Sequence, residues 1–232
     1  MPLIDNFKPR TLSLALALLA ATAHNASAQE VALFPSGDPG LLTDPFLQNP
    51  SAKTVNVVWM TNFPGVEHKV LIDRSGGNSA APAQPDSSIP RGTSPYRAET
   101  VKLERVFEDG ASKLDNAPGE VMQRKVYRHE AVVSGLRAGE ALQYWVQSRS
   151  VAGETFEAGP FRLQPLPAAG APLQILLTSD QQERFNTLAN YQKVAELFPE
   201  LDAVFFAGDL ANHPRRASEW FDNRRAAWES NP

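Results

Sequence analysis

A short apolar run near the end of the sequence, residues 203–207 (Ala-Val-Phe-Phe-Ala), is followed at once by Gly208 and Asp209. A run of this length, rich in Val and Phe and closed by a glycine, predicts a strand buried on both faces. Residues 173–178 form a similar run, two residues before Asp180. Open α/β sheets bind their ligands beyond the carboxyl ends of the strands. We therefore expect Asp180 and Asp209 to lie close together, where both carboxylates can bind a cation.

The stretch between these two predicted strands has the spacing of an amphipathic helix. Its apolar residues recur at steps of three and four, before Pro199 ends the pattern: Leu188, Tyr191, Val194, Ala195 and Phe198. Two parallel strands require a crossover connection of this kind. A second helix, with Pro214 in its first turn, is predicted from Ala217, Trp220, Phe221 and Trp228. Parallel sheets are buried on both faces and are normally larger than two strands, so residues 173–232 are interpreted as an incomplete α/β domain.

Residues 44–164 have the pattern of an all-β domain. Short runs of alternating apolar residues, separated by turn residues, predict six or seven strands. These runs are residues 54–60, 69–73, 96–106, 125–133, 142–148 and 156–163. Residues 75–95 are rich in Gly, Ser, Pro, Ala and Asn and are interpreted as a long loop. This arrangement favours a β-sandwich, in which His68 and His129 are expected to be ordinary surface or strand residues.

A family resemblance is visible in residues 129–146 (His-Glu-Ala-Val-Val-Ser-Gly-Leu-Arg-Ala-Gly-Glu-Ala-Leu-Gln-Tyr-Trp-Val). The segment resembles the corner of a fibronectin type III-like sandwich, where a leucine and a turn precede an aromatic strand. The corner tyrosine usual in that family falls at Leu142 here, and Tyr144 follows on the same face. The resemblance implies a fibronectin III-like sandwich over residues 29–164. The segment 165–172, rich in Pro and Ala, is then a semi-stiff linker.

Residues 1–28 have the features of a secretory signal peptide. Lys8 and Arg10 precede an apolar stretch, residues 12–23, and Ala26-Ser-Ala28 is a small-residue cleavage site. The stretch is too short to span a bilayer, so we expect a secreted or periplasmic protein without a membrane span after cleavage. A retained anchor helix is the alternative. The chain has no cysteine, hence no disulfide, and its net charge of −4 gives no electrostatic case for a nucleic-acid partner.

The two strand ends carry a second resemblance. Asp180-Gln-Gln182 and Gly208-Asp209 are similar to the first two motifs of the calcineurin-like metallophosphoesterases. These motifs are Asp-x-His, or Asp-x-Gly in the purple acid phosphatases, and Gly-Asp. A sandwich in front of the motifs further resembles the purple acid phosphatases. The resemblance covers residues 44–232 and implies an all-β sandwich followed by the first βαβα portion of an α/β metallophosphoesterase domain, residues 173–232.

In that family, a centre of two metal ions (Fe, Mn or Zn) hydrolyses phosphate esters. By resemblance, Asp180 binds the first metal ion, and Asp209 bridges the two ions and offsets their repulsion. Gln182 stands at the His-or-Gly position, where its amide oxygen is a poorer ligand than imidazole. Asn212 stands where the purple acid phosphatases have the tyrosine that binds ferric iron, which argues against a ferric site. His213 is either a further ligand or a residue that starts the next helix.

The sequence supplies only part of the family's ligand set, because the Gly-Asn-His motif and the later histidines have no counterpart in it. We therefore expect weak metal binding and no appreciable phosphatase activity from this chain alone. Two interpretations remain open. The chain is the N-terminal part of an exported purple acid phosphatase-like metallophosphoesterase, truncated before its site is complete. Alternatively, it is a fibronectin-like binding module with a vestigial C-terminal extension.

Overall fold

The computed structural model describes residues 32–35, 37–75, 89–112, 114–182 and 186–221. The chain divides into two compact units, residues 1–30 and 31–232, and every described residue belongs to the second unit. The expected signal peptide, most of the expected loop 75–95 and Trp228 lie outside the described residues. Within the described ranges, no helix has both the length and the apolar character needed to cross a membrane.

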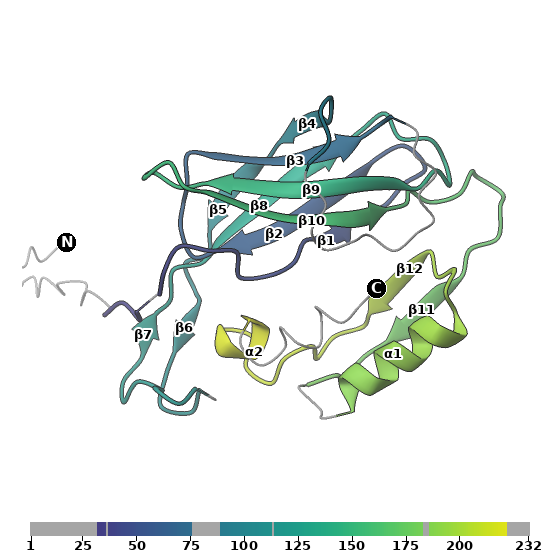
Figure 1. Ribbon diagram of the computed structural model, residues 1–232. Coiled ribbons are helices and arrows are strands. Elements are labelled where there is room, and N and C mark those ends of the chain that lie inside the picture. The colour runs from purple at the N-terminus through teal and green to yellow at the C-terminus, as the bar shows by residue number, and fades with distance from the viewer. Residues whose placement is uncertain (1–31, 36, 76–88, 113, 183–185, 222–232) are drawn as a thin grey trace, which may run out of the picture. The chain divides into compact units, whose positions relative to one another are not determined.

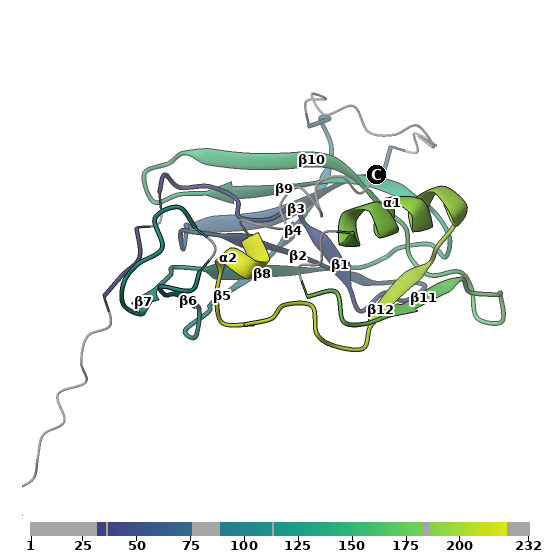
Figure 2. The ribbon, with the colours of Figure 1, turned by 90° about the horizontal axis from the view of Figure 1, so that it is seen from below.

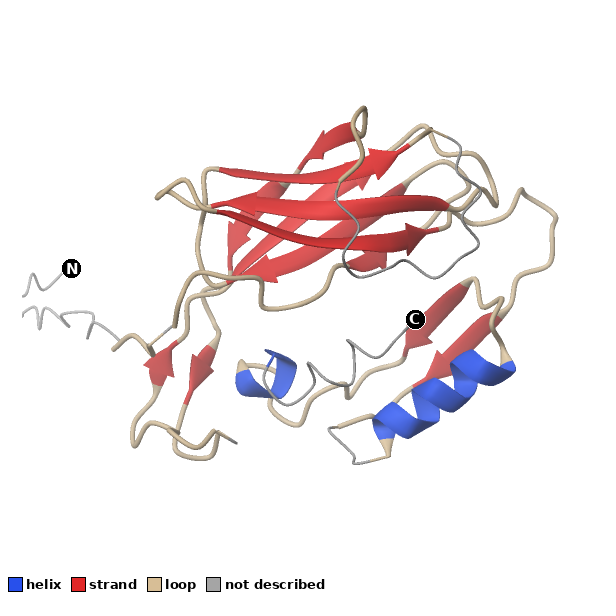
Figure 3. Ribbon diagram, in the orientation of Figure 1, coloured by secondary structure: helices blue, strands red, loops and turns tan. Residues whose placement is uncertain are grey.

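Two antiparallel four-stranded sheets face each other in a β-sandwich, as the sequence predicted (Figures 1 and 3). The first sheet has the strand order β1 (Phe46–Gln48), β2 (Val55–Thr61), β8 (Tyr127–Val133) and β5 (Glu99–Lys102). The second has the order β10 (Thr155–Leu163), β9 (Leu142–Arg149), β3 (Glu67–Asp73) and β4 (Ser94–Arg97).

The core lies between these sheets because apolar residues alternate along the strands. In β2, the side chains of Val55, Val57 and Trp59 are fully buried. Further core residues come from both sheets: Val70, Ile72, Ala131, Val133, Leu142, Tyr144, Val146 and Leu163. The indole N–H of Trp59 donates to Ser148 Oγ of the opposite sheet over 2.9 Å, so the buried polar end of the tryptophan is satisfied.

The single strand predicted for residues 96–106 is in fact two strands in different sheets. β4 pairs with β3, whereas β5 pairs with β8. The chain passes from one sheet to the other at Ala98, whose N–H donates to the His68 carbonyl over 2.9 Å. The expected loop also ends earlier than predicted, because Pro95 belongs to β4. This strand is at the edge of its sheet, where the missing N–H of a proline is tolerated.

A small hairpin, β6 (Phe107–Glu108) and β7 (Met122–Gln123), extends from the sandwich. Leu33 bridges β7 in parallel, and Arg216 bridges β6 in parallel. The segment around Arg216 therefore adds to the edge of this hairpin. Figures 1 and 2 show the short helix α2 (Ser218–Phe221) beside it. This hairpin was not predicted from the sequence as an element of its own.

The last part of the described chain begins with β11 (Ile175–Thr178), α1 (Thr187–Leu197) and β12 (Ala203–Phe206). β11 and β12 pair in parallel, with Ile175 opposite Ala203 and Thr178 opposite Phe206. Helix α1 lies along one face of this pair, where the Tyr191 ring meets the Phe206 ring edge-on at 6.2 Å (Figure 1).

The prediction that both strands are buried on both faces is wrong. On the face away from α1, Leu177 is 72% exposed and Phe205 is 56% exposed. Alternation along a strand puts neighbouring side chains on opposite faces, and α1 covers only one of them. The apolar sequence pattern therefore describes a face that the described residues leave largely exposed.

The second predicted helix begins later than expected. The helix α2 begins at Ser218, so Pro214 precedes it instead of standing in its first turn. Pro214 instead lies in a turn, where its carbonyl accepts a hydrogen bond from the indole N–H of Trp220 over 2.9 Å. Ala217 and Phe221 are buried together with Val126 in a second, smaller apolar cluster.

Candidate metal centre

The loops that follow β11 and β12 lie side by side, as the parallel pairing requires. Three backbone hydrogen bonds continue from strand to loop. The Ala207 N–H donates to the Thr178 carbonyl over 2.8 Å, and the Asp180 N–H donates to the Gly208 carbonyl over 3.3 Å. The Gln182 N–H donates to the Asp209 carbonyl over 3.0 Å. Asp180 and Asp209 are therefore held on adjacent backbone segments, where the sequence placed them.

The backbone of these loops is strained at the candidate ligands. Asp180, Gln182 and Asp209 have φ angles of +57°, +37° and +52°. These angles lie in the left-handed region, which residues other than Gly rarely adopt. Each such residue costs on the order of 1–2 kcal/mol, and residues held in this way cluster at functional sites. Gly208, with φ of +125°, makes the sharp exit from β12 possible.

Side-chain hydrogen bonds join three of the candidate residues, Gln182, Asp209 and Asn212. Gln182 Nε2 donates to Asp209 Oδ2 over 3.0 Å, and Asn212 Nδ2 donates to the Gln182 carbonyl over 3.4 Å. Asp180 Oδ2 accepts from the Ser179 hydroxyl over 2.5 Å. Asp180 and Asp209 are exposed, so both carboxylates are open to solvent and to ions. The structure thus brings together four of the five predicted ligands.

His213, the fifth, is anchored in a different direction. Its backbone N–H donates to Glu219 Oε2 over 2.8 Å, and its backbone carbonyl accepts from the Arg216 backbone N–H over 2.9 Å. It does not start a helix, because α2 begins at Ser218. The hydrogen bond from Arg216 is the main cause of the lowered pKa of the nearby Asp109.

The donors that are present suit a hard cation in part. Carboxylate and amide oxygens are ligands that Mg²⁺, Mn²⁺ and similar ions accept. In the part of the chain that the structure describes, however, no three His, Cys, Asp or Glu side chains lie close enough to hold one metal ion. Asp180, Asp209, Gln182 and Asn212 therefore fit part of one coordination sphere and do not complete a centre of two ions.

His68 and His129 were expected to be ordinary surface or strand residues. In the structure both are buried and take part in hydrogen bonds through both ring nitrogens. His68 Nε2 contacts the Pro64 carbonyl at 2.7 Å, so this nitrogen carries the proton, and Nδ1 accepts from the Ser148 hydroxyl over 2.9 Å. Both rings lie in the sandwich core. Strand alternation gives the signal that finds them, because His68 is in phase with Val70 and His129 with Ala131.

His129 is fixed in the same manner. The Thr61 hydroxyl donates to the Phe63 carbonyl over 2.5 Å and so accepts from His129 Nε2 over 2.8 Å. His129 Nδ1 then accepts from the Thr100 hydroxyl over 2.9 Å. Burial, with a smaller effect from His68, lowers the pKa of His129 to about 3, so this ring is neutral.

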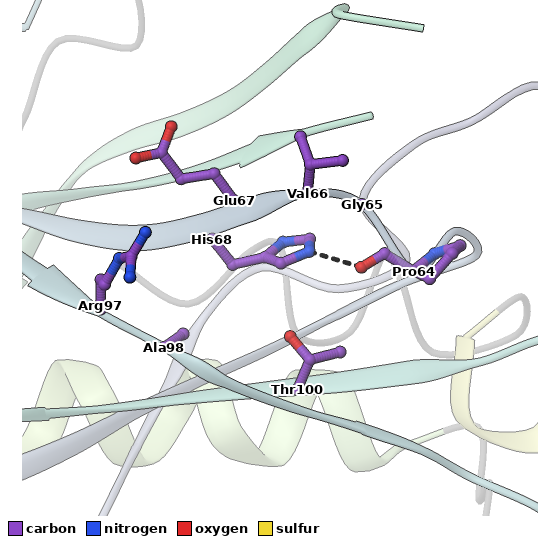
Figure 4. A pocket seen from close by; sticks show the side chains of 8 residues that line it. All are labelled: Pro64, Gly65, Val66, Glu67, His68, Arg97, Ala98 and Thr100. Carbon is purple, nitrogen blue, oxygen red and sulfur yellow. Dashed lines mark hydrogen bonds between the residues drawn. The ribbon is translucent and has the colours of Figure 1, made fainter. Parts of the chain in front are cut away.

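A pocket of about 290 Å³ opens beside His68 (Figure 4). It is lined by Pro64, Gly65, Val66, Glu67, His68, Arg97, Ala98 and Thr100. The hydrogen bond from His68 Nε2 to the Pro64 carbonyl runs along its wall, and His68 Nδ1 is also engaged. Because both ring nitrogens have partners, the pocket presents no free imidazole nitrogen to a ligand.

No family model matches the chain, and no curated protein is similar to it. One similar solved structure is the purple acid phosphatase PPD1 from seeds of yellow lupin (Lupinus luteus). It has 18% sequence identity and a TM-score of 0.54, and the match covers 80% of this chain and 32% of that chain. The chain therefore has a purple acid phosphatase-like fold and spans about a third of the length of that neighbour.

Another match is to Astrotactin-2, a conserved vertebrate-specific and perforin-like membrane protein involved in neuronal development. The sequence identity is 10% and the TM-score 0.30, with 68% of this chain and 26% of that chain covered. A TM-score this low carries no argument about fold or function.

Proposed function

We propose that this chain is the N-terminal part of an exported purple acid phosphatase-like metallophosphoesterase, which hydrolyses phosphate esters at a centre of two metal ions. The observation that carries the proposal is the pair of adjacent strand-end loops, with left-handed backbone at Asp180, Gln182 and Asp209. The fold of the lupin phosphatase supports it. In this proposal, residues 29–164 are a fibronectin III-like sandwich, 165–172 a linker and 173–232 the opening βαβα portion of the metallophosphoesterase domain.

Asp180 would hold the first metal ion and Asp209 would bridge to the second. When bound, such ions lower the pKa of a bound water and stabilise charge on the phosphoryl oxygens. Gln182 holds Asp209 Oδ2 through its amide N–H, and Asn212 holds the Gln182 backbone. These two residues thus orient the Asp209 carboxylate that would bridge the ions.

The bare face of β11 and β12 supports the view that further protein completes this domain. Ile175, Leu177 and Phe205 are exposed on that face. Parallel sheets occur almost only with both faces covered, and contiguous apolar patches are limited on monomers. We propose that the covering layers and the remaining metal ligands belong to a longer chain, and that the residues present here have no appreciable phosphatase activity alone.

The second candidate function is a fibronectin-like binding module with a vestigial extension. It is favoured by the incomplete ligand set, since no three His, Cys, Asp or Glu side chains among the described residues lie close enough to hold one metal ion. The contacts of the extension weigh against it. Ala217 and Phe221 are buried against Val126 next to the sandwich, and Ser218 is fully buried, which a vestigial tail does not require.

Manganese binding tests the proposed site. In the isotope-labelled chain, Mn²⁺ at millimolar concentration should broaden the NMR amide signals of Asp180 and Asp209 before others. Asp209→Asn should abolish this selective broadening, and Asp115→Asn, which changes an exposed acid elsewhere, should not. Uniform broadening, or none, would contradict the metal site.

Hydrolysis of p-nitrophenyl phosphate with added Mn²⁺, Fe²⁺ or Zn²⁺ tests the expected inactivity. Turnover that disappears in Asp209→Asn would show that the chain is already a complete enzyme.

Sequencing the DNA downstream of residue 232 for a Gly-Asn-His motif in any reading frame separates the two candidate functions.

A further inference from the structure

Glu108, in the β6–β7 hairpin, carries a carboxylate that is completely buried. It accepts hydrogen bonds from Arg124 Nη1 over 2.9 Å, from the Ser218 N–H over 2.8 Å and from the Ser218 hydroxyl over 2.9 Å. A buried carboxylate is costly unless it is paired and hydrogen-bonded. Both the N–H and the hydroxyl of Ser218 donate to this carboxylate, so the segment around Ser218 stabilises it in the core.

The neighbouring Asp109 makes a second charged contact to the same segment. Arg216 binds its carboxylate through two nitrogens, with Nε to Oδ1 at 2.9 Å and Nη2 to Oδ2 at 3.1 Å. Paired contacts of this kind fix the orientation of the guanidinium as well as its position. The Arg216 and Asp109 side chains are only 14% and 22% exposed, so water screens this pair less than a surface pair.

Backbone and apolar contacts act in the same place. The Phe107 N–H donates to the Arg215 carbonyl over 2.9 Å, and the Ala217 N–H donates to the Phe107 carbonyl over 3.1 Å. The Arg124 guanidinium lies 6.0 Å from the Phe221 ring centroid. Residues 215–218 are therefore held by main chain, charge and packing together.

The segment held in this way is the continuation of the candidate metal loop. The loop is fixed at one end by the contacts of Gln182 with Asp209, and at the other end by the contacts of residues 215–218 with the hairpin. Residues 210–214, which include Asn212 and His213, span the two attachment points. Pro214 removes further freedom because its ring fixes φ.

We propose that the β6–β7 hairpin positions this loop, with Glu108 and Asp109 as the positioning residues, so that the sandwich sets where Asp209, Asn212 and His213 stand. The value of this positioning for metal binding rests on the proposed function. The positioning itself is a property of the metal-free chain and is measurable without any ion.

Asp109→Asn and Glu108→Gln test the proposal in the whole chain, with Glu104→Gln as the matched control. Glu104 is a nearby acid with an exposed side chain, paired with Lys102 over 2.9 Å. Both test variants should speed hydrogen exchange of the Ala217 and Ser218 amides by ~10-fold or more, because each variant weakens a charged contact that holds residues 215–218 against the hairpin. Asp109 is partly exposed, so Asp109→Asn is expected to fold even if Glu108→Gln does not.

A positional readout separates positioning from general stability. In both test variants, the NMR amide signals of residues 209–213 should shift under conditions where the chain is fully folded, whereas signals of β2 and β9 should not. Unchanged exchange and unchanged shifts, or the same changes in Glu104→Gln, would overturn the proposal. If Mn²⁺ does not broaden the Asp209 signal of the wild-type chain, the proposed function is contradicted. The positioning role of the hairpin is tested separately, by the amide shifts of the metal-free variants.

Discussion

The imidazole rings of His68 and His129 stack in the sandwich core, with centroids 3.7 Å apart and planes 17° apart. The two rings come from opposite sheets, β3 and β8, so the stack is part of what joins the sheets. Each ring is held as one neutral tautomer by hydroxyl and carbonyl partners. A proton added to either ring would place a charge in the core and against the other ring.

Sandwich stability should therefore fall in acid. Burial lowers the pKa of His129 from 6.5 to about 3, and burial also lowers that of His68 against smaller opposing effects of Pro64 and Glu67. The unfolded chain binds protons first as pH falls below 6.5, so acid favours unfolding. Between pH 6 and 4, His129 alone should remove about 1.4 kcal/mol of unfolding free energy per pH unit.

Urea unfolding at a series of pH values measures this slope. His129→Gln, which has no group that titrates there, should flatten it between pH 6.5 and 5, above the range of most carboxyl groups. An equally steep slope in the variant would show that other groups cause the acid sensitivity.

Gly65→Ala should destabilise the sandwich by about 2 kcal/mol or more. A Cβ at this position would lie 2.4 Å from His68 Nε2 and 2.8 Å from the Arg149 carbonyl oxygen, and φ is +62°. Gly139→Ala is the matched control, since Gly139 has φ of +73° but nothing within 4 Å of the added Cβ. Thermal unfolding should show a clearly larger loss for Gly65→Ala. Equal losses of stability in the two variants would mean that the positive φ alone, and not the contact of the new Cβ with His68, causes the destabilisation.

Polar substitution on the bare face of β11 and β12 should cost little. Leu177→Ser and Phe205→Ser remove exposed apolar surface, so each should change the free energy of unfolding by less than about 0.5 kcal/mol and raise solubility. Phe206→Ser, on the face that meets Tyr191, should cost about 1–2 kcal/mol. Sedimentation and urea unfolding measure both effects. A large loss of stability for Leu177→Ser would show that this face is covered in solution.

The backbone at Asp209 should discriminate between two substitutions that both remove its charge. Asn accommodates left-handed φ, and β-branched Val does not, so Asp209→Val should cost about 2 kcal/mol more than Asp209→Asn. Urea unfolding of the metal-free chain measures the difference. Equal stability of the two variants would mean that the loop does not hold residue 209 at φ of +52°.

The adjacency of Asp180 and Asp209 was predictable because it depends on local patterns, two apolar runs each closed by a polar turn. Burial of Leu177 was predicted wrongly because a sequence run shows that a face is apolar and not what covers it. The partnership of Glu108 with Ser218 left no local signal, since hydrophobic periodicity reports on neighbours within a few residues and these partners are 110 positions apart.

That separation has a consequence for synthesis. Chains emerge from the ribosome N-terminus first, and contacts between distant residues form late. When the hairpin has been made, Arg124 is available to the Glu108 carboxylate, but both donors from Ser218 are still to be translated. During this interval the carboxylate must stay hydrated, so the hairpin closes over it last. A pulse-chase with arrest at residue 210 should trap a folded sandwich whose hairpin remains open to protease.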